Sequence, residues 1–553
     1  MTRQLPKSIR DNLRFLIVEV DSQLDSLQAY FALPSTVGVR RILDRSGYAY
    51  NLKIRIQDSC LNKITSSKKN DDLETLRLRG IEFIASNLAR ITDLSRDCIK
   101  QMDSVTDPEN LDTSVYMPVL GRVREALKMV EPAIQENDTR QALRMGEVRA
   151  KLERDYNKLL KNYITALKQK KSNTEDLTCA LFVAHSIEQM GDALLDISEA
   201  IISANVGMPV NFDRYQSLLA SMAQLDSEED VSDIQVEPIA KTRSGSAISG
   251  ISVPYEEEYL AIFKDGRKRK LKEERKGVNS WHEIYPGLAP KILSYKKNGQ
   301  SAALLIEHLP GLTFEKILLN ESPELQKQTL QQLGKTLKSV WRETRSEKPV
   351  CAYFMNQLEK RLHDVYKIHP EFEQGDIQVC GVQIPSFDSL VERACKYEES
   401  GFQAPFSVYI HGDFNVDNII YDPLEKRINF IDLHRSRYMD YVQDVSVFMV
   451  SNYRLQILDA PRRHRIMDVA RDFYHIVRRY ANQTGDETFE IRLALGLARS
   501  FATSTRFILD KSLARNMFLR SRYLIEQVLA VDFKQNPKQA RKYKIPLKEI
   551  FVD

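Results

Sequence analysis

The segment HGDFNVDN at residues 411–418, followed by Asp432, constrains the fold of this chain more than any other feature. Apolar runs at residues 406–410 and 419–421 predict short strands on either side of the segment. Residues 427–431 predict a third strand, which ends directly before Asp432. Because two strands hold the ends of the segment and a third delivers an acid beside it, we expect a rigid loop that presents polar side chains from fixed positions.

The polar side chains of this loop match the requirements of phosphoryl transfer from a metal-bound nucleotide. Asp413 can face an acceptor hydroxyl, while the amide oxygen of Asn418 and the carboxylate of Asp432 are ligands of the kind that Mg²⁺ prefers. Asp and Asn also favour turns through local hydrogen bonds, but turn formation alone requires neither this spacing nor the flanking strands. The loop therefore predicts a kinase-type site.

The region before the loop predicts the elements that a nucleotide site needs. A strand at residues 234–239, a Ser-rich loop with Gly245 and Gly250, and a strand at 251–255 precede an alternating strand that ends on Lys264. A glycine-bearing turn lets backbone N–H groups approach phosphate, and a lysine neutralises its charge. Since Gly-Ser runs also occur as plain linkers, Lys264 is the stronger indication because of its place in this order of elements.

In this order, the motifs resemble those of the aminoglycoside phosphotransferase and choline kinase-like branch of the protein-kinase fold. The resemblance implies an α+β two-lobed domain that uses ATP and Mg²⁺. It implies Asp413 as the catalytic base, with Asn418 and Asp432 as the magnesium ligands. It also implies that His411 packs in support of the loop and that Asp444 is structural.

The resemblance assigns further nucleotide contacts outside the loop. An acid on the helix after the small-lobe lysine would pair with that lysine, and Glu274 is preferred to Glu273, although the choice stays open. Residues 304–313 resemble the hinge between the two lobes. The backbone near Glu307 and Leu309 would hold the adenine ring of ATP.

The first 210 residues have almost no Gly or Pro within long amphipathic stretches. Six helices are predicted, at about residues 9–33, 37–66, 71–102, 117–137, 139–169 and 174–204. Short connections between long helices imply a bundle. Asp93 and Asp97 recur as Asp192 and Asp196 in a matching stretch, so the bundle is predicted to be two copies of a three-helix unit.

The second copy of the matching stretch, at residues 187–197, resembles the signature helix of the PhoU phosphate-regulation proteins. Glu188, Asp192 and Asp196 are spaced four residues apart and so line one helical face. In that family such acids bind metal ions, and the resemblance implies a metal site for these three. A solvated face or pairing with basic residues stays open, since the first copy has Ala89 where the second has Glu188.

These observations predict a multidomain chain. A PhoU-like all-α six-helix bundle of two three-helix repeats is expected at residues 1–210, followed by an acidic linker at 211–233. An α+β kinase domain is expected at 234–553, with a small lobe at 234–309 and a large lobe at 310–553.

Composition limits the partners and the location of the chain. The net charge of +4 is near balance for a chain with 28% charged residues and decides nothing about partners. The basic run at 267–272 lies beside Glu273 and Glu274 without interleaved aromatics, so we expect a solvated helix face and no nucleic-acid partner. Six cysteines without metal-ligand spacing predict reduced thiols.

No apolar run is long enough to span a bilayer, and the N-terminal residues lack an apolar signal core. We therefore expect a cytoplasmic protein without a transmembrane segment. Peripheral membrane contact and a homodimer both stay open.

The resemblances together predict an ATP- and Mg²⁺-dependent phosphotransferase that acts on the hydroxyl of a small metabolite. The PhoU-like part would be regulatory and linked to phosphate status. Two alternatives stay open. Residues 431–435 also resemble the metal-acid segment of lipopolysaccharide core kinases, which implies a lipid-linked sugar acceptor. The chain could instead be a non-catalytic nucleotide-binding regulator of phosphate homeostasis, but Asp413, Asn418, Asp432 and Lys264 favour catalysis.

Overall fold

The computed structural model describes residues 5–66, 72–107, 111–168, 174–207, 209–222, 235–241, 247–252, 261–298, 301–399, 401–457, 459–531 and 542–552. The chain forms two compact units, Met1–Asp265 and Gly266–Asp553. Each unit has its own hydrophobic core.

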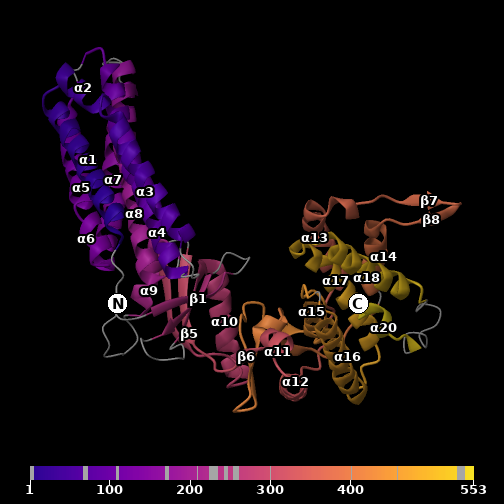
Figure 1. Ribbon diagram of the computed structural model, residues 1–553. Helices are drawn as coiled ribbons and strands as arrows, with labels where there is room; N and C mark the ends of the chain where they lie inside the picture. The colour runs from indigo at the N-terminus through magenta and orange to yellow at the C-terminus, as the bar shows by residue number, and fades with distance from the viewer. Residues whose placement is uncertain are drawn as a thin grey trace. The chain divides into compact units, whose positions relative to one another are not determined.

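Long helices that lie side by side dominate the first unit (Figure 1). Their bounds are α1 Lys7–Ala32, α3 Ser46–Ser66, α4 Asp72–Asp103, α7 Thr139–Lys168 and α8 Thr174–Val206. Helix α8 packs against both α4 and α7. It buries an apolar stripe at helical spacing that includes Ile187, Met190 and Leu194. Gly191 allows α7 to approach closely, because a Cβ there would press on the side chain of Leu152.

Two of the six predicted helices are broken in the structure. The predicted helix at 37–66 is α2 Thr36–Leu43 and α3, and the predicted helix at 117–137 is α5 Met117–Leu127 and α6 Val130–Gln135. Between α2 and α3, Arg45 turns back to hydrogen-bond Glu19 and Ser22 on α1. Pro132, in the first turn of α6, has no N–H to continue an α-helical ladder from α5. The other four predicted helices are confirmed.

The segment predicted as an acidic linker, 211–233, is helical in its first half. Helix α9 covers Phe212–Met222, and residues 223–234 lie outside the described residues. The helix forms because Phe212 and Leu218 are buried and the Phe212 N–H donates to Glu199 on α8 (2.9 Å). The acidic composition that suggested a linker begins only after this helix.

Three antiparallel strands follow α9. They are β1 Gln235–Lys241, β2 Ala247–Ser252 and β3 Ala261–Arg267, and the boundary between the two units falls within β3. Strand β2 begins earlier than predicted, so Gly250 lies inside the strand, opposite Glu237 and Ile262, and not in a turn. Gly245 lies outside the described residues.

The second unit begins with α10 Lys268–Ile284 and the hairpin of β4 Ile292–Asn298 and β5 Ser301–Glu307. Strand β6 Leu312–Thr313 then pairs with β10 Ile419–Asp422, which also pairs with β11 Arg427–Phe430. Strand β9 Val408–Ile410 pairs with β12 Arg437–Met439. The three strands predicted around residues 411–432 are therefore confirmed, whereas β12 was not predicted.

Helices make up most of the rest of the second unit (Figure 1). They are α11 Phe314–Asn320, α12 Pro323–Glu343, α13 Phe354–Ile368, α14 Phe387–Glu399, α15 Val442–Tyr453, α16 Ala460–Gln483, α17 Phe489–Ser504, α18 Lys511–Leu529 and α20 Leu547–Ile550. Helix α17 is the most enclosed, because α13, α15 and α18 all pack on it. An exposed hairpin, β7 Ile377–Val379 and β8 Val382–Ile384, was not predicted. Within the described ranges, no helix is both long and apolar enough to span a bilayer.

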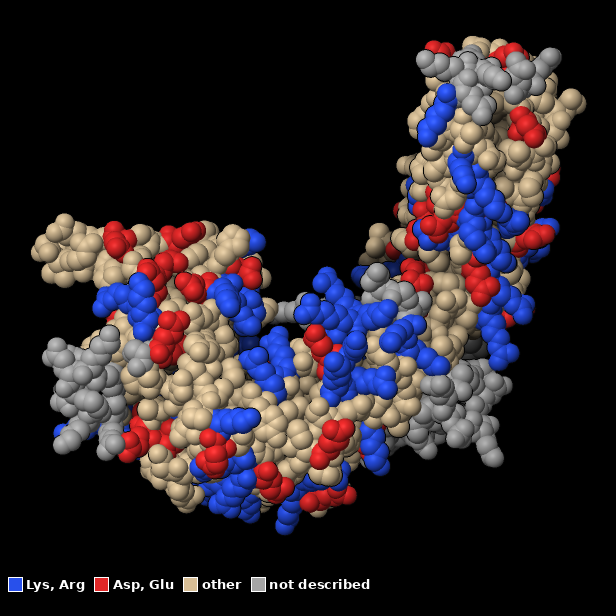
Figure 2. Space-filling model, turned by 180° about the vertical axis from the view of Figure 1, so that it is seen from behind, with Lys and Arg blue, Asp and Glu red and all other residues tan. Residues whose placement is uncertain are grey.

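The basic run before Glu273 lies on the exposed side of α10, as expected. The lysines and arginines of the run are exposed or half-buried, whereas Leu271 and Glu274 on the same helix are buried. Figure 2 shows Lys and Arg side chains gathered in groups on the visible surface, with fewer Asp and Glu side chains among them.

Candidate active site

The loop at residues 411–418 connects β9 to β10, and β11 returns the chain to its side. Gly412 is required at the first bend because its φ is +81° and a Cβ would overlap the carbonyl oxygen of Arg435. The close approach of residues 412 and 435 brings the start of the loop against the segment that follows Asp432.

His411 ties these two segments together from within. The backbone N–H of Asp413 donates to Nδ1 of His411 (3.2 Å), so the proton of the neutral ring lies on Nε2. Nε2 then donates to the carbonyl oxygen of Ile431 (2.9 Å). Burial lowers the pKa of His411, which favours this neutral form. His411 thus supports the loop and does not face solvent, as expected.

Asp444 holds the loop from the opposite side. It lies in the first turn of α15, and its two carboxylate oxygens accept the backbone N–H groups of His411 (2.7 Å) and Gly412 (2.8 Å). Burial raises the pKa of Asp444 to about 7. Because both oxygens are engaged with the backbone, Asp444 is a structural residue, in agreement with the sequence.

A buried ionic network fixes the start of α15. Asp440 accepts the Val442 N–H (3.0 Å), and Arg492 on α17 forms ion pairs with both Asp440 and Asp486. All three side chains are almost fully buried. Because removal of one member would leave an uncompensated buried charge, the network holds α15 and its Asp444 firmly in place.

Asp413 is partly accessible, with 21% of its side chain exposed. The Asn415 amide donates to Oδ1 (3.0 Å), and Nη1 of Arg435 lies 3.4 Å from Oδ2. Asn415 is itself held by Arg454 on the C-terminal side of α15 (3.2 Å). The carboxylate is therefore oriented by its neighbours and open on one side, as a base for an acceptor hydroxyl requires.

Asn418 and Asp432 present oxygens next to this base. The Asn418 amide nitrogen donates to the carbonyl oxygen of Asp413 (2.9 Å), and its Oδ1 accepts no hydrogen bond within the described part of the chain. Asp432 has a φ of +61° and is a quarter exposed, with Oδ1 3.2 Å from Nδ1 of His434. Burial raises the pKa of Asp417, and the nearby charges of Asp413 and Asp432 raise it further. This concentration of carboxylates would be relieved by a divalent cation.

The residues present therefore fit a magnesium site in which the protein supplies only a few of the ligands. In the described ranges no three His, Cys, Asp or Glu side chains come together as a metal cage would require. Mg²⁺ in kinases is held by one or two carboxylates or amides, with waters and substrate phosphates completing its shell. Asn418 and Asp432 match that pattern, although their role as ligands stays a prediction.

The predicted nucleotide contacts lie on separate elements. Lys264 is buried on β3, in the first unit. On α10 in the second unit, Glu274 is buried, whereas Glu273 is exposed and pairs with Arg269 (3.1 Å). Of the two acids that the sequence left open, Glu274 thus has the burial expected of a partner for a buried lysine. The pairing with Lys264 itself stays a prediction.

Helix α10 is anchored beside the site by a glycine. A Cβ at Gly277 would overlap the carbonyl oxygen of Leu433, the residue after Asp432. The indole N–H of Trp281 also donates to Ser436 Oγ (2.8 Å). Helix α10 therefore rests directly on the segment that carries Asp432.

The predicted hinge follows β5. The backbone N–H of Lys291 donates a hydrogen bond to the Glu307 side chain (3.0 Å), and this bond holds the end of β5. Leu309, two residues later, is buried. Gly311 has a φ of +107° and packs against the carbonyl oxygen of Tyr421 on β10. The chain thus turns sharply at residue 311, whereas adenine binding near Glu307 and Leu309 stays a prediction.

The three acids of the bundle that were predicted as a metal site each lie near a basic side chain. Asp192 lies 3.0 Å from Arg149 on α7, and Asp196 lies 3.8 Å from Arg90 on α4. Glu188 lies 3.5 Å from His185 one turn earlier in α8. The described residues contain no cluster of metal-ligating side chains here. The three acids therefore fit pairing with basic residues, the alternative left open by the sequence, better than a metal site.

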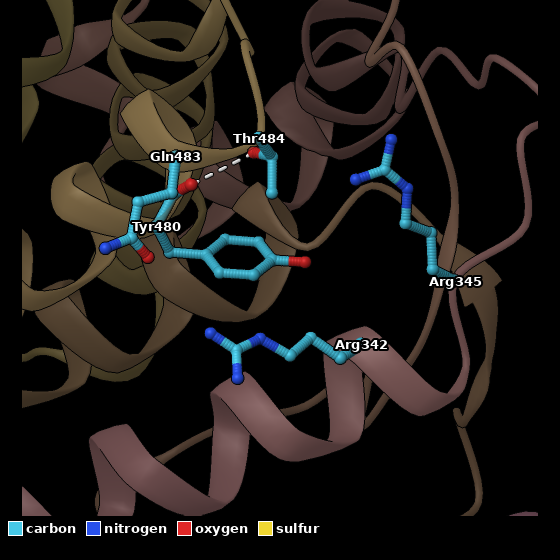
Figure 3. Close-up of a pocket in the computed structure, with 5 residues that line it drawn as sticks. All are labelled: Arg342, Arg345, Tyr480, Gln483 and Thr484. Atoms are coloured by element: carbon cyan, nitrogen blue, oxygen red, sulfur yellow. Dashed lines mark hydrogen bonds between the residues drawn. The ribbon is translucent and has the colours of Figure 1, made fainter.

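A separate pocket of about 240 Å³ lies between α12 and α16. Figure 3 shows its lining, which consists of Arg342, Arg345, Tyr480, Gln483 and Thr484. The Thr484 hydroxyl donates to the Tyr480 carbonyl oxygen (3.0 Å), and Arg345 pairs with Glu347 (2.7 Å). None of the residues that line it belongs to the loop at 411–418, so this pocket is not the candidate site.

Sequence reasoning missed three arginines whose charges act on Asp413. They are Arg361 on α13, Arg499 on α17 and Arg506 just after α17. No pattern distinguishes them in the sequence, because arginines on amphipathic helices are usually solvated. Their position depends on how α13 and α17 pack together.

Comparison with known proteins gives the two halves of the chain different relatives. The sequence model of the phosphotransferase enzyme family matches residues 280–473, and that of the PhoU domain matches residues 119–201. A PhoU homologue of Zymomonas mobilis, described as a phosphate-specific transport system accessory protein, is 24% identical over 226 residues. The match covers 40% of this chain and 84% of that protein.

Solved structures similar to each half are also found. The crystal structure of PhoU from Pseudomonas aeruginosa has 14% identity and a TM-score of 0.34, covering 36% of this chain and 96% of that one. The aminoglycoside-3'-phosphotransferase of type VIII has 14% identity and a TM-score of 0.34, covering 52% and 97%. The ethanolamine kinase of Plasmodium vivax has 13% identity and a TM-score of 0.32, covering 59% and 89%.

The predicted fold class, a PhoU-like helical region followed by a kinase-like α+β domain, is confirmed. The chain thus joins a PhoU domain, matched at residues 119–201, to a domain of the phosphotransferase enzyme family, matched at residues 280–473.

Proposed function

We propose that this protein transfers the γ-phosphoryl group of ATP to the hydroxyl group of a small molecule. The observation that carries the proposal is the single loop that holds Asp413 and Asn418 rigidly beside Asp432, inside the match to the phosphotransferase family. His411, Asp444 and Gly412 all serve to fix that loop.

Asp413 would accept the proton of the acceptor hydroxyl as the oxygen attacks. Its carboxylate is oriented by Asn415 and keeps one side accessible. Asn418 and Asp432 would hold Mg²⁺, which when bound neutralises charge on the phosphates. Buried Lys264 would hold the phosphates of ATP, and Glu274 would keep the lysine oriented. Most of the catalytic effect would come from positioning and charge, because phosphoryl transfer needs little covalent help from the protein.

The test is transfer of label from γ-labelled ATP, with Mg²⁺, into fractions of a metabolite extract by the full chain. We expect a labelled small molecule with the wild type and almost none with Asp413→Asn. Asp468→Asn is the matched control, because Asp468 is an exposed acid on α16 that pairs with Arg471. If no fraction accepts label although ATP binds, the chain is a nucleotide-binding regulator. Label that appears only in a lipid fraction would favour the lipid-linked sugar acceptor.

We propose in addition that the PhoU-like unit regulates this transfer in response to phosphate. The match to the PhoU domain is what supports this second proposal. The initial rate of transfer by the full chain should change when inorganic phosphate is added at constant ionic strength, whereas chloride should have no effect. A rate that is identical with both salts would contradict regulation by phosphate.

A further inference from the structure

Arg499 on α17 is a buried cation with two donor nitrogens that lack a hydrogen-bond partner in the described part of the chain. Only 5% of the residue is exposed, and its Nε and Nη2 atoms have no hydrogen-bond partner among the described residues. Its guanidinium lies 5.8 Å from the ring of Phe354. Burial lowers the pKa of Arg499 to about 9, since the charged form is poorly solvated there. Guanidinium donors are rarely left unpaired in protein interiors, so this position calls for an oxyanion.

Two buried acids whose pKa the charge of Arg499 affects are engaged elsewhere. Asp444 accepts the backbone N–H groups of the loop, as described above. Glu398 accepts the N–H groups of Phe354 (2.7 Å) and Met355 (2.9 Å), the first residues of α13. Burial raises the pKa of both acids to about 7, so neither is a full counter-charge at neutral pH. Arg499 donates to neither of them.

Two further arginines come from elements that pack on α17. Arg361 comes from α13 and forms no ion pair or hydrogen bond with any described residue, and Arg506 comes from the 3₁₀ turn Thr505–Phe507. The Nε of Arg506 is buried without a partner, and its Nη1 lies 3.7 Å from Asp364. Helices α13 and α17 and the 3₁₀ turn pack on one another. The charge of Arg361 acts on both Arg499 and Arg506.

The same three arginines lie within electrostatic range of Asp413. The negative charge of Asp413 raises the pKa of each of them, against the larger effect of burial. A fourth guanidinium, that of Arg435, lies 3.4 Å from the Asp413 carboxylate. The unsatisfied donors therefore lie within electrostatic range of the carboxylate that is proposed as the base.

We propose that the acceptor of this phosphotransferase carries an anionic oxyanion group, which Arg499 binds together with Arg361 and Arg506. The inference deepens the proposed function, on which it rests, by assigning the substrate class. The group would be a phosphate, sulfate or carboxylate on the same molecule as the reacting hydroxyl, because the charge of Asp413 reaches all three arginines. The two or three oxygens of this group would accept charge-assisted hydrogen bonds from the unpaired guanidinium donors.

The arginines belong to the acceptor side of the site. All three lie on elements after residue 353, whereas the elements predicted to hold ATP lie before residue 314. Loss of an arginine should therefore weaken binding of the acceptor and leave the affinity for ATP unchanged. The opposite pattern would assign the arginines to the transferring phosphate.

The experiment measures binding to the full chain by calorimetry without ATP. The probes are inorganic phosphate, sulfate, and two matched pairs: glycerol 3-phosphate with glycerol, and glucose 6-phosphate with glucose. We expect at least one anionic probe to bind and its neutral counterpart not to bind. Arg361→Gln and Arg506→Gln, at partly exposed positions, should each weaken that binding by about tenfold or more.

Arg499→Gln should have the largest effect, and the two other variants keep the test valid if this one does not fold. The control is Arg393→Gln, an exposed arginine on α14, which should bind like the wild type. Equal binding by all variants, or no binding of any anionic probe, would overturn the inference.

A phosphoryl-transfer assay separates the inference from the function on which it rests. If a neutral alcohol is phosphorylated and no anion binds, the inference falls and the kinase stands. If arginine-dependent anion binding occurs and no acceptor is ever phosphorylated, the kinase proposal falls, and the assignment of these arginines to an acceptor falls with it.

Discussion

Gly412 is the residue at which the candidate site tolerates change least. Its backbone has a positive φ, and a side chain would overlap the Arg435 carbonyl oxygen. Gly485 has a similar φ of +70° but open space around it. Gly485→Ala should lower the free energy of unfolding by about 1 kcal/mol from backbone strain alone. Gly412→Ala should cost more than that and abolish transfer, because the loop and residue 435 must separate.

Unfolding of the second unit can be measured by tryptophan fluorescence. The chain has two tryptophans, Trp281 and Trp341, and both are buried in the second unit. A urea titration of both glycine variants would give the comparison. Equal losses of stability would show that the contact with Arg435 does not constrain Gly412.

Glu398 makes the stability of the second unit depend on pH. Burial raises its pKa from the ordinary value near 4.5 to about 7. Between these two values the folded state keeps a proton that the unfolded state has lost, so stability falls as pH rises, by at most about 1.4 kcal/mol per pH unit. Glu398→Gln removes this contribution.

The difference in free energy of unfolding, wild type minus Glu398→Gln, should therefore decrease from pH 5 to pH 7 and level off above it. Urea titrations at several pH values measure it. Glu392→Gln is the control on the same helix, because Glu392 is exposed and its pKa is lowered by Lys396. A difference that is constant from pH 5 to pH 7 would show that Glu398 is ionised throughout that range.

Single residues also show where sequence reasoning succeeds and where it ends. Strands β9, β10 and β11 formed as predicted, because the pattern around Asp413, Asn418 and Asp432 is a local property of the chain, whereas the roles of these three residues stay predictions. Arg499 was not found, since its burial requires α13, α15 and α18 to surround α17. Local patterns carry no information on such packing.

Among the elements, α10 has the most direct effect on the site. It carries Glu274 and contacts Leu433 through Gly277. Gly277→Ala should push α10 away from that backbone and lower the rate of transfer by about tenfold or more, because a misplacement of 1 Å near a site is costly. Gly334→Ala on α12 is the control, since its Cβ would meet only the side chain of Ile476, which can move.

Steady-state kinetics of the two variants would test this prediction. Both proteins should fold, as judged by tryptophan fluorescence, and only Gly277→Ala should lose activity. Equal rates would mean that the position of α10 does not matter for transfer.

The breaks within elements were harder to predict than the elements themselves. Pro132 was visible in the sequence, but a proline near the start of a helix is as common as one that interrupts it. The break after α2 depends on Arg45 reaching Glu19 on α1, a contact between distant parts of the sequence. Helix α9 was missed because the acidic residues after it dominated the composition of the segment.

At the scale of the whole molecule, the PhoU-like unit raises the question of a second metal. Asp192 and Asp196 pair with Arg149 and Arg90, which supply the positive charge that a metal would bring. Asp192→Ala should therefore leave the metal content of the purified full chain unchanged, as measured by mass spectrometry. Arg149→Ala should leave it unchanged as well, because the pair holds no ion. A loss of bound metal in Asp192→Ala alone would restore the metal site that the sequence suggested.

The most direct test of the kinase assignment is the rate of γ-phosphoryl transfer in a single turnover, measured with saturating ATP, Mg²⁺ and the acceptor found in the extract. With Asp413 as the base in a site that otherwise stays intact, Asp413→Asn should slow this step by about a hundredfold or more. Its affinity for ATP should equal that of the wild type. A transfer step of unchanged rate in Asp413→Asn would contradict the assignment of the catalytic loop.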